Sequence, residues 1–340
     1  MVVKKGDIAI MGGGVQGLLL AYYAKVFYPR RTVSLFESRI IGGGITAYSA
    51  HLHAPFGRGA KYDLTVQSLD LFSKLLEEYW DLPLLKVEIK GICRRENLSS
   101  ILCTLVEKSP NINSYTYPFN ELSEEYICIS GLAGYVSKRN LTGSLMEIVA
   151  SLGVKIHEGT AIVSAKKDGN GYKLLSNTGQ VYSASYIFNA TGKDVIRSLL
   201  QAGTIVETKK VVALHVDKPT LPDAPVYMYF DHDAFLLPQP YYSRYLLSCF
   251  SNEWNVEDNP ALQINNSDLE LGKRILNIYT KDFSEQISGG QVFLDVYNRH
   301  SGAPLIHEVE KNHFIIGATG GSGVRLAPAL AVNALKKLSL

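Results

Sequence analysis

The chain has 340 residues, of which 46% are hydrophobic and 19% are charged, and its formal net charge is +2. This length exceeds what a single hydrophobic core usually holds, so we expect two domains or one domain with a large insertion. The balanced charge indicates neither nucleic-acid binding nor a basic membrane surface, no apolar run reaches the roughly 20 residues that span a bilayer, and four dispersed cysteines without metal spacing favour a reducing, cytoplasmic location.

The first motif is a short apolar strand at residues 7–11 that runs into Gly12-x-Gly14-x-x-Gly17 and an apolar helix. A second apolar strand then ends at Glu37. In such a unit Gly12 permits the tight turn, Gly14 lets the backbone approach a pyrophosphate, and Gly17 lets the helix pack closely. The helix N-terminus offers free N–H groups to the phosphates, and Glu37 would accept hydrogen bonds from ribose hydroxyls. The motif predicts a dinucleotide site and leaves the choice between NAD and FAD open.

Residues 42–53 come next and combine glycines with small hydroxyl side chains and two histidines. The glycines would let the backbone lie close to a flat or charged group, to which Thr46 and Ser49 can donate hydrogen bonds. His51 and His53 form a His-x-His pair, a spacing that suggests a metal site. No third ligand with suitable spacing accompanies them, so we expect no bound metal.

Helical and strand-like periodicities divide the rest of the chain. Asn140 or Thr142 could cap one of the helices, and the Pro/Asn/Ser/Tyr-rich residues 108–120 are expected to form a surface loop or a connection between domains. Helices are expected at residues 61–80, 145–152, 194–201, 267–280 and 328–337. Strands are expected at residues 85–89, 126–129, 154–157, 160–166, 172–175, 182–189 and 291–297, and in a strand-rich block at 205–250.

The same order of strand, glycine loop and helix occurs at both ends of the chain, and the second loop comprises residues 317–323. An N-terminal βαβ unit does not need a second glycine loop three hundred residues later. A long ligand lying across the sheet would need both loops. The repetition therefore favours FAD over NAD.

These motifs together resemble the superfamily of D-amino-acid oxidase, glycine oxidase and sarcosine oxidase. The resemblance is carried by the first glycine loop with Glu37 and by residues 42–49, 135–163, 189–192 and 320–328. It implies an α/β fold in which a Rossmann-like FAD-binding domain of the GR2 type is assembled from separated segments, with an antiparallel, β-rich substrate domain inserted. The FAD-binding domain would comprise residues 1–55, 131–202 and 299–340, and the substrate domain residues 56–130 and 203–298.

The resemblance also implies which residues contact FAD. We expect the flavin to be noncovalently bound, because no cysteine lies near residues 292–298, while attachment at His51 stays open. The expected FAD contacts are Gly12, Gly14, Val15, Gln16, Gly17, Glu37, Ser38, Gly43, Gly44, Thr46, Ser49, Ala161, Ile162, Ala190, Thr191, Gly192, Gly320, Gly321, Ser322, Gly323, Val324 and Arg325.

The chemistry implied by the resemblance is hydride transfer from the carbon that bears an amine to flavin N5. The product imine then hydrolyses, and oxygen or another acceptor reoxidises the flavin. The substrate would be a small amine or amino acid, whose carboxylate an arginine can bind through two hydrogen bonds. Arg299 stands where the family has such an arginine, although His300 rather than proline follows it.

Three further catalytic candidates follow from the same resemblance. Arg325 matches a lysine that contacts substrate carboxylate in sarcosine oxidases, or it could contact the O2/N1 edge of the flavin. His53 would face the substrate or the flavin edge. Phe235 replaces a tyrosine of the D-amino-acid oxidases and would make the pocket wall more apolar.

Two other functions remain open from the sequence. A flavin monooxygenase or hydroxylase usually carries an Asp-Gly pair ahead of the last glycine loop, where this chain has Gly317-Ala318. A protein that binds FAD without catalysis is the third hypothesis. For the leading hypothesis we expect no nucleic-acid partner and no membrane span, and a homo-oligomer is compatible with the sequence.

Overall fold

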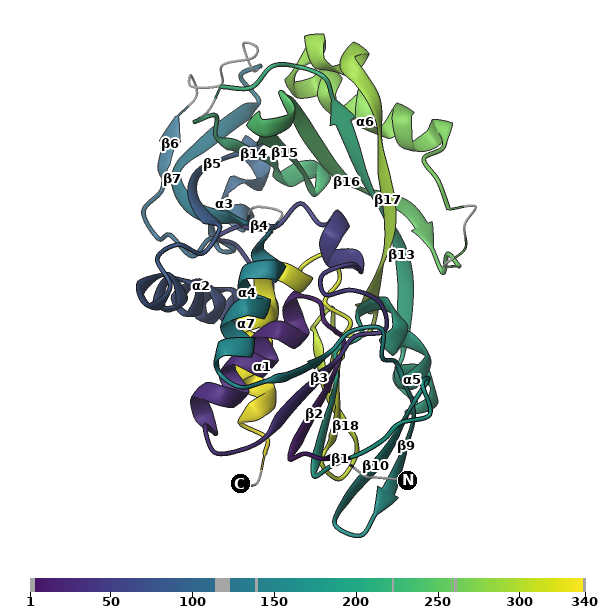
Figure 1. Ribbon diagram of the computed structural model, residues 1–340. Helices are drawn as coiled ribbons and strands as arrows, with labels where there is room; N and C mark the ends of the chain where they lie inside the picture. Colours follow the sequence, from purple (N-terminus) through teal and green to yellow (C-terminus); the bar gives the residue numbers. More distant parts are fainter. Residues whose placement is uncertain are drawn as a thin grey trace.

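Three β-sheets and the helices packed on them make up the described part of the chain, which in this computed structural model comprises residues 4–113, 123–137, 140–221, 223–257, 259 and 262–338. Figure 1 shows a large sheet in the upper part of the molecule and a smaller sheet with its helices in the lower part. Strands β13 and β17 run from the upper part down along one side. The arrangement confirms the expected α/β class.

The apolar strand before the first glycine loop lies at the centre of the smaller, six-stranded sheet. β2 (Ile8–Met11) pairs in parallel with β3 (Val33–Phe36) on one side and with β12 (Tyr186–Asn189) on the other. Ile8 and Ile10 are fully buried, as in a strand covered on both faces. The sheet has the order β18-β19-β12-β2-β3-β8, and its other strands are β8 (Lys155–His157), β18 (Leu305–Glu310) and β19 (His313–Gly317).

Helices cover one face of this sheet, and a four-stranded sheet covers the other. Leu18 and Leu330 pack in the core under the helices, whereas Ala9 and Ile187 face Leu174 of the four-stranded sheet. The helices beside the six-stranded sheet in Figure 1 are α1 (Val15–Phe27), α2 (Lys61–Glu78), α4 (Leu141–Ser151) and α7 (Gly323–Leu335). The four-stranded sheet contains β1 (Lys4–Lys5), β9 (Ile162–Asp168), β10 (Gly171–Ser176) and β11 (Val181–Ala184).

The larger sheet has nine strands. Neighbouring strands in it are antiparallel, except that β14 and β5 are parallel. α6 (Asn266–Tyr279) packs on it through Ile275 and Leu276. Its strands are β4 (Leu52–His53), β5 (Leu84–Arg94), β6 (Asn111–Asn113), β7 (Tyr126–Ser137), β13 (Val206–Val216), β14 (Val226–Tyr229), β15 (Ala234–Gln239), β16 (Arg244–Trp254) and β17 (Ile287–Asn298). Short elements are α3 (Leu98–Leu102), α5 (Val195–Gln201), η1 (Ile45–Tyr48), η3 (Gly192–Asp194) and η4 (Phe230–His232).

The last helix begins earlier than the sequence predicts. Proline favours the first turn of a helix, so the pattern placed the start at Pro328, but α7 begins at Gly323 and holds Pro328 in its interior. An interior proline costs about 3 kcal/mol. Leu326 and Ala327 are fully buried in the core shared with α1 and α2, and this burial offsets the cost.

Two other expectations require correction. The single strand expected at 182–189 is split at Ser185, where the N–H groups of Ser185 and Tyr186 both donate to the Asp7 carbonyl, so that β11 and β12 join different sheets. Within the loop expected at 108–120, residues 111–113 form β6, and residues 114–120 lie outside the described part.

The division into domains stays a prediction. β4 and the whole of β7 belong to the nine-stranded sheet, whereas the resemblance assigns residues 1–55 and 131–202 to the FAD-binding part. The four cysteines are free thiols. Among the described residues, no helix has the length and apolar character needed to cross a membrane.

A buried lysine ties α6 to the nine-stranded sheet. Lys210 on β13 is 1% exposed, and its Nζ lies 2.7 Å from Asp268 Oδ2 on α6 and 2.8 Å from Glu253 Oε1 on β16. Asp268 is also buried and completes a capping box with Asn265 at the start of α6. Removing the lysine would leave the Asp268 carboxylate buried without its cation.

We predict that Lys210→Ala lowers the free energy of unfolding by about 3–5 kcal/mol, because breaking a buried ion pair leaves an uncompensated charge. Urea unfolding followed by circular dichroism measures it. Lys273→Ala is the control, since Lys273 pairs with Glu270 at 3.6 Å on the exposed side of the same helix, and such pairs contribute about 0–1 kcal/mol. Equal losses in the two variants would contradict the role given to Lys210.

Candidate active site

Both glycine loops line one cavity of about 390 Å³ between the six-stranded and nine-stranded sheets. Gly14 follows the carboxyl end of β2, Thr191 follows β12, and Gly320 follows β19, so three parallel strands deliver their loops to the same edge. That edge is where open α/β sheets bind ligands. The opposite wall comes from the inner face of the nine-stranded sheet, including Phe235 and Asp295.

Two of the three glycines in the first loop serve packing rather than contact with the cavity. Gly12 has φ +106°, and a Cβ there would lie 2.5 Å from the Ala190 carbonyl oxygen. A Cβ at Gly17 would lie 1.8 Å from the Gly12 oxygen, so the helix can approach the turn only without a side chain. Neither residue lines the cavity.

The N-terminus of α1 faces the cavity through Gly14, Val15 and Gln16. Gly14 is the N-cap and provides no side-chain cap, and the Val15 N–H donates to Thr46 Oγ1 at 3.4 Å. The buried Gln16 Oε1 has no hydrogen-bond partner. A helix N-terminus with exposed N–H groups carries partial positive charge and suits an anionic group.

The carboxylate of Glu37 is held at the same end of the cavity. Its Oε2 accepts from the Gly13 N–H at 2.8 Å, and its Oε1 accepts from the Arg39 N–H at 2.8 Å and the Ser38 hydroxyl at 3.0 Å. The donors fix the carboxylate and leave lone pairs for hydroxyl donors of a ligand. Ala161 does not line the cavity, although the neighbouring Thr160 N–H donates to the Glu37 carbonyl at 2.7 Å.

The two histidines separate, one toward the cavity and one into the core. His51 lines the cavity with φ +53°, and its Nε2 donates to the Thr46 carbonyl at 2.6 Å while its Nδ1 has no partner. Burial lowers the pKa of His51. His53 lies behind the wall, fully buried, with Nε2 hydrogen-bonded to Ser137 Oγ at 2.7 Å and its ring 4.3 Å from that of Phe72.

The second glycine loop packs its bare backbone on aromatic rings of the nine-stranded sheet. Gly320 and Gly321 both have positive φ, and Cβ atoms there would lie 2.6 Å from the Tyr297 ring and 3.0 Å from the Phe250 ring. The loop leads into Arg325, whose Nη2 donates to Ser322 Oγ at 2.8 Å and whose Cζ lies 4.8 Å from the centre of the Phe56 ring.

Arg325 stays charged in this setting. Burial lowers its pKa to about 10, against the effect of Asp233. Its buried Nε has no hydrogen-bond partner. A guanidinium in a cavity wall, held by one hydroxyl, is suited to binding a carboxylate.

Lys61 and Asp295 join Arg325 in the cavity wall, and the sequence analysis missed both. Lys61 Nζ donates to the carbonyls of Thr319 at 3.0 Å and Gly320 at 3.1 Å. Burial, together with Arg325, lowers the pKa of Lys61 to about 8. Burial raises the pKa of Asp295 to about 6, while Lys61 and a hydrogen bond from the Gly321 N–H lower it.

The signals for these two residues differ. Lys61 opens an amphipathic helix, where a lysine is usually a surface residue. Asp295 alternates with Phe293 and Tyr297 along β17, and all three line the cavity. A lone acid between two aromatic residues on the same strand face was the available clue.

Arg299, the first sequence candidate for binding carboxylate, is not brought to the cavity. β17 ends at Asn298, and a turn in which the Gly302 N–H donates to the Asn298 carbonyl at 2.8 Å redirects the chain. The Arg299 side chain is half exposed, pairs with Glu207 at 3.3 Å and stacks on Trp254 with Cζ 4.5 Å from the ring centre.

Most of the expected residues do line the cavity, whereas a few lie beside or behind it. Those in the wall are Gly14, Val15, Gln16, Glu37, Ser38, Gly44, Thr46, Ser49, Ala190, Thr191, Gly192, Phe235, Gly320, Gly321, Ser322, Gly323, Val324 and Arg325. Those not in the wall are Gly12, Gly17, Gly43, His53, Ala161, Ile162 and Arg299.

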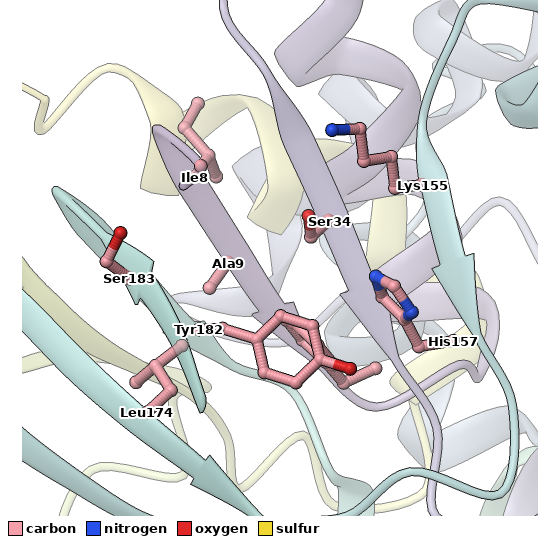
Figure 2. Close-up of a pocket in the computed structure, with 10 residues that line it drawn as sticks. Ile8, Ala9, Ser34, Lys155, His157, Leu174, Tyr182 and Ser183 are labelled. Carbon is pink, nitrogen blue, oxygen red and sulfur yellow. The ribbon is translucent and has the colours of Figure 1, made fainter. Parts of the chain in front are cut away.

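A second cavity of about 180 Å³ lies between the six-stranded and four-stranded sheets (Figure 2). Figure 2 shows Lys155 and His157 on one side and Tyr182 and Leu174 on the other. The His157 ring stacks on Phe36 at 4.9 Å. Among the described residues, the two cavities share no lining residue, so this one is separate from the site above.

The chain matches one protein-family model and is similar in fold to several solved structures. The model of the DAO family, described as FAD dependent oxidoreductase, matches residues 123–334. A comparison with curated proteins finds no match. Solved structures with a similar fold include glycine oxidase from Geobacillus kaustophilus, with 17% identity, TM-score 0.78 and coverage of 97% of this chain and 93% of that chain.

Two further solved structures are similar at comparable levels. L-proline dehydrogenase from P. horikoshii has 16% identity and TM-score 0.80, with coverage of 99% of this chain and 94% of that chain. L-amino acid deaminase from Proteus vulgaris has 12% identity and TM-score 0.78, with coverage of 98% and 94%. At these identities the likeness establishes the fold, including the first 122 residues that the family model does not reach.

The buried His53 generates a pH prediction. Burial, with smaller effects of His51 and Arg325, lowers its pKa to about 3. The unfolded chain therefore binds a proton near the ordinary histidine pKa of about 6.5 that the folded protein does not. We expect this residue to make the protein less stable as the pH falls from 6.5 toward 3, by about 1 kcal/mol per pH unit.

In His53→Gln, which can keep a hydrogen bond to Ser137, urea unfolding between pH 6 and pH 4 should show a shallower loss of stability than in the wild type. His300→Gln in the exposed turn is the control and should keep the wild-type slope. A wild-type slope in His53→Gln would show that His53 takes up its proton in the folded protein.

Proposed function

Because the chain belongs to the DAO family of FAD dependent oxidoreductases, we propose that it oxidises the C–N bond of a small amine or amino acid to an imine by hydride transfer to flavin N5. The observation that carries the proposal is Arg325, a partly buried guanidinium held by one hydroxyl in the cavity that both glycine loops line. Oxygen or another acceptor would complete the cycle.

The residues present fit FAD. The α1 N-terminus, bare at Gly14, is suited to the pyrophosphate, and the fixed carboxylate of Glu37 lies at the same end for the adenosine ribose. The unpartnered Gln16 Oε1 and His51 Nδ1 are buried polar atoms along the same wall that a ligand can satisfy. When bound, FAD supplies the hydride acceptor at its N5 atom.

The chain would bind and orient the substrate through groups of two kinds. Arg325, fixed by Ser322, would hold a carboxylate. The aromatic side chains of Phe235, Phe250 and Phe293 in the same wall would exclude water and pack on the substrate carbon chain. Holding the reacting carbon in place is a large part of catalysis in such a reaction.

The charges in the wall favour an amino acid over a simple amine. Lys61 and Arg325 are cationic, and Asp233 and Asp295 are acidic, so the wall offers both signs. A zwitterion can place its carboxylate at Arg325 and its ammonium near an acid. A simple amine would leave the guanidinium of Arg325 buried without an anion, which is unfavourable.

Gly14→Val should abolish FAD binding while leaving the fold intact. A Cβ at Gly14 would meet only Thr46 Oγ1, at 3.0 Å, so the added atoms project toward the ligand rather than into the core. The flavin absorbance per protein after purification measures the loss, and circular dichroism reports the fold. Gly143→Val, in α4 where no atom lies within 4 Å of the added Cβ, is the control and should stay yellow. A fully loaded Gly14→Val protein would contradict the phosphate site.

Arg325→Met should weaken the binding of an amino-acid substrate by roughly 10- to 100-fold, since a charged hydrogen bond contributes about 1.5–3 kcal/mol. The measurement is anaerobic flavin reduction over a panel of amino acids, N-methyl amino acids and amines, with substrate concentration varied for the best of them. Arg299→Met, outside the cavity, is the matched control and should bind as the wild type does.

Three results would contradict parts of the proposal. Unchanged binding in Arg325→Met would show that Arg325 does not bind the substrate carboxylate. Weakened binding in Arg299→Met would assign that role to Arg299. Wild-type flavin that no amine reduces would exclude amine oxidation, and NAD(P)H oxidation by that protein would favour the hydroxylase hypothesis.

A further inference from the structure

Asp295 differs from the other carboxylates of the large cavity. Glu37 is occupied by three donors, and Asp194 lies in η3 beside the Thr191 loop. Asp233 has an exposed side chain at the rim. Asp295 projects from the middle of β17 between Phe293 and Tyr297, on the wall that also contains Arg325.

A cation lies beside this carboxylate. Lys61 comes from α2, and its Nζ is anchored by the carbonyls of Thr319 and Gly320 and lies 5.9 Å from the centre of the Tyr297 ring. The Gly321 N–H donates to the Asp295 carboxylate from the same loop. The second glycine loop therefore positions both side chains, one through its carbonyl groups and the other through an N–H group.

The proposed reaction needs a proton acceptor at this place. Amines are protonated at neutral pH, and an ammonium has no lone pair to assist the departure of hydride from the neighbouring carbon. Inside a cavity that bound FAD and substrate would fill, bulk water is poorly placed to take that proton. A carboxylate in the wall, near the site for the substrate carboxylate, can.

We propose that Asp295 accepts the proton of the substrate ammonium, with Lys61 as the positioning residue that keeps the carboxylate ionised. In this step one N–H bond of the ammonium breaks, an O–H bond forms on Asp295, and the electron pair stays on nitrogen. The inference rests on the proposed oxidation of an amine and assigns a residue to its first proton transfer.

The electrostatic surroundings support the assignment. Burial alone would favour the neutral acid, and Lys61 and the Gly321 N–H oppose it, which gives Asp295 a pKa of about 6. An acceptor with a pKa slightly below neutral is ionised at pH 7 and still basic enough to take a proton. The register partner of Asp295 on β13 is Lys209, and Tyr297 is near it on β17. The other charged or titratable groups that line the cavity are Glu37, Arg39, His51, Arg58, Lys193, Asp194, Asp233 and Arg325.

The test is the pH dependence of anaerobic flavin reduction at saturating substrate. In the wild type the rate should rise tenfold per pH unit below about pH 6 and then level off, because Asp295 must be ionised. In Asp295→Asn only substrate that has already lost its proton can react, so the rate should keep rising to the pKa of the substrate amine. At pH 7 the variant should be slower by roughly 100-fold, as is typical for loss of acid–base catalysis, and the two rates should converge at high pH.

Two further variants make the test specific. In Lys61→Met the pH at which the rate of flavin reduction levels off should be higher than in the wild type, because the variant lacks the cation that favours ionised Asp295. Glu207→Gln changes a carboxylate on β13, outside the cavity and opposite Tyr297 in the β13–β17 pair, and should keep the wild-type profile. Propionate, which has no amine, should perturb the flavin spectrum of Asp295→Asn with at least the wild-type affinity at pH 8, because the variant removes a negative charge near the bound anion.

The outcomes separate the two claims. If amines reduce the wild type and Asp295→Asn keeps its pH profile, the assignment of Asp295 is overturned and amine oxidation stands. A loss of propionate binding in Asp295→Asn would overturn the assignment in favour of a structural role. If no amine reduces the wild type, the proposed function falls, and the role of Asp295 falls with it.

Discussion

The close packing that bare glycine backbone permits at the two glycine loops is the constraint on which the site depends. Gly12 lies against the end of β12, and Gly17 lies against Gly12, at distances that no side chain permits. Gly320 repeats this at the other end of the chain by lying flat on Tyr297. Because both loops are bare, helix and strand ends face the cavity with their N–H and C=O groups. At one end of the cavity the N–H groups would hold phosphates. At the other end, the carbonyls of Thr319 and Gly320 anchor Lys61, and the Gly321 N–H binds Asp295.

The far end of the cavity places charges in apolar surroundings. Arg325, Lys61 and Asp295 lie among phenylalanine rings, where charge interactions are stronger than in water and where an unpaired charge is costly. Their shifted pKa values share this one cause, burial, and each is moderated by its neighbours. Strongly shifted groups in one cavity are typical of functional sites. The family assignment gives the redox cofactor, and these groups support the proposed substrate.

The sequence was sufficient to predict the structural elements that a local pattern of residues decides. The turn at Gly12, the strand that leads to Glu37 and the helix expected at 61–80 and found at Lys61–Glu78 all followed from spacing. It failed where the outcome depends on residues distant in the chain. Arg299 misses the cavity because β17 ends one residue before it, and Lys61 looked like a surface residue because the carbonyls that it binds lie more than 250 positions away. The break at Ser185 likewise depends on the carbonyl of Asp7, between β1 and β2.

The central claim is that one cavity holds FAD from Glu37 to the Arg325 end, with the substrate under β17. The most direct measurement is a crystal structure of the FAD-loaded protein with a bound carboxylic acid that cannot be oxidised. The account predicts adenosine ribose hydroxyls in hydrogen-bond contact with Glu37 and the ligand carboxylate on Arg325, with the carbon that would bear the amine directed toward Asp295. A ribose away from Glu37, or a ligand bound on the outer side at Arg299, would contradict it.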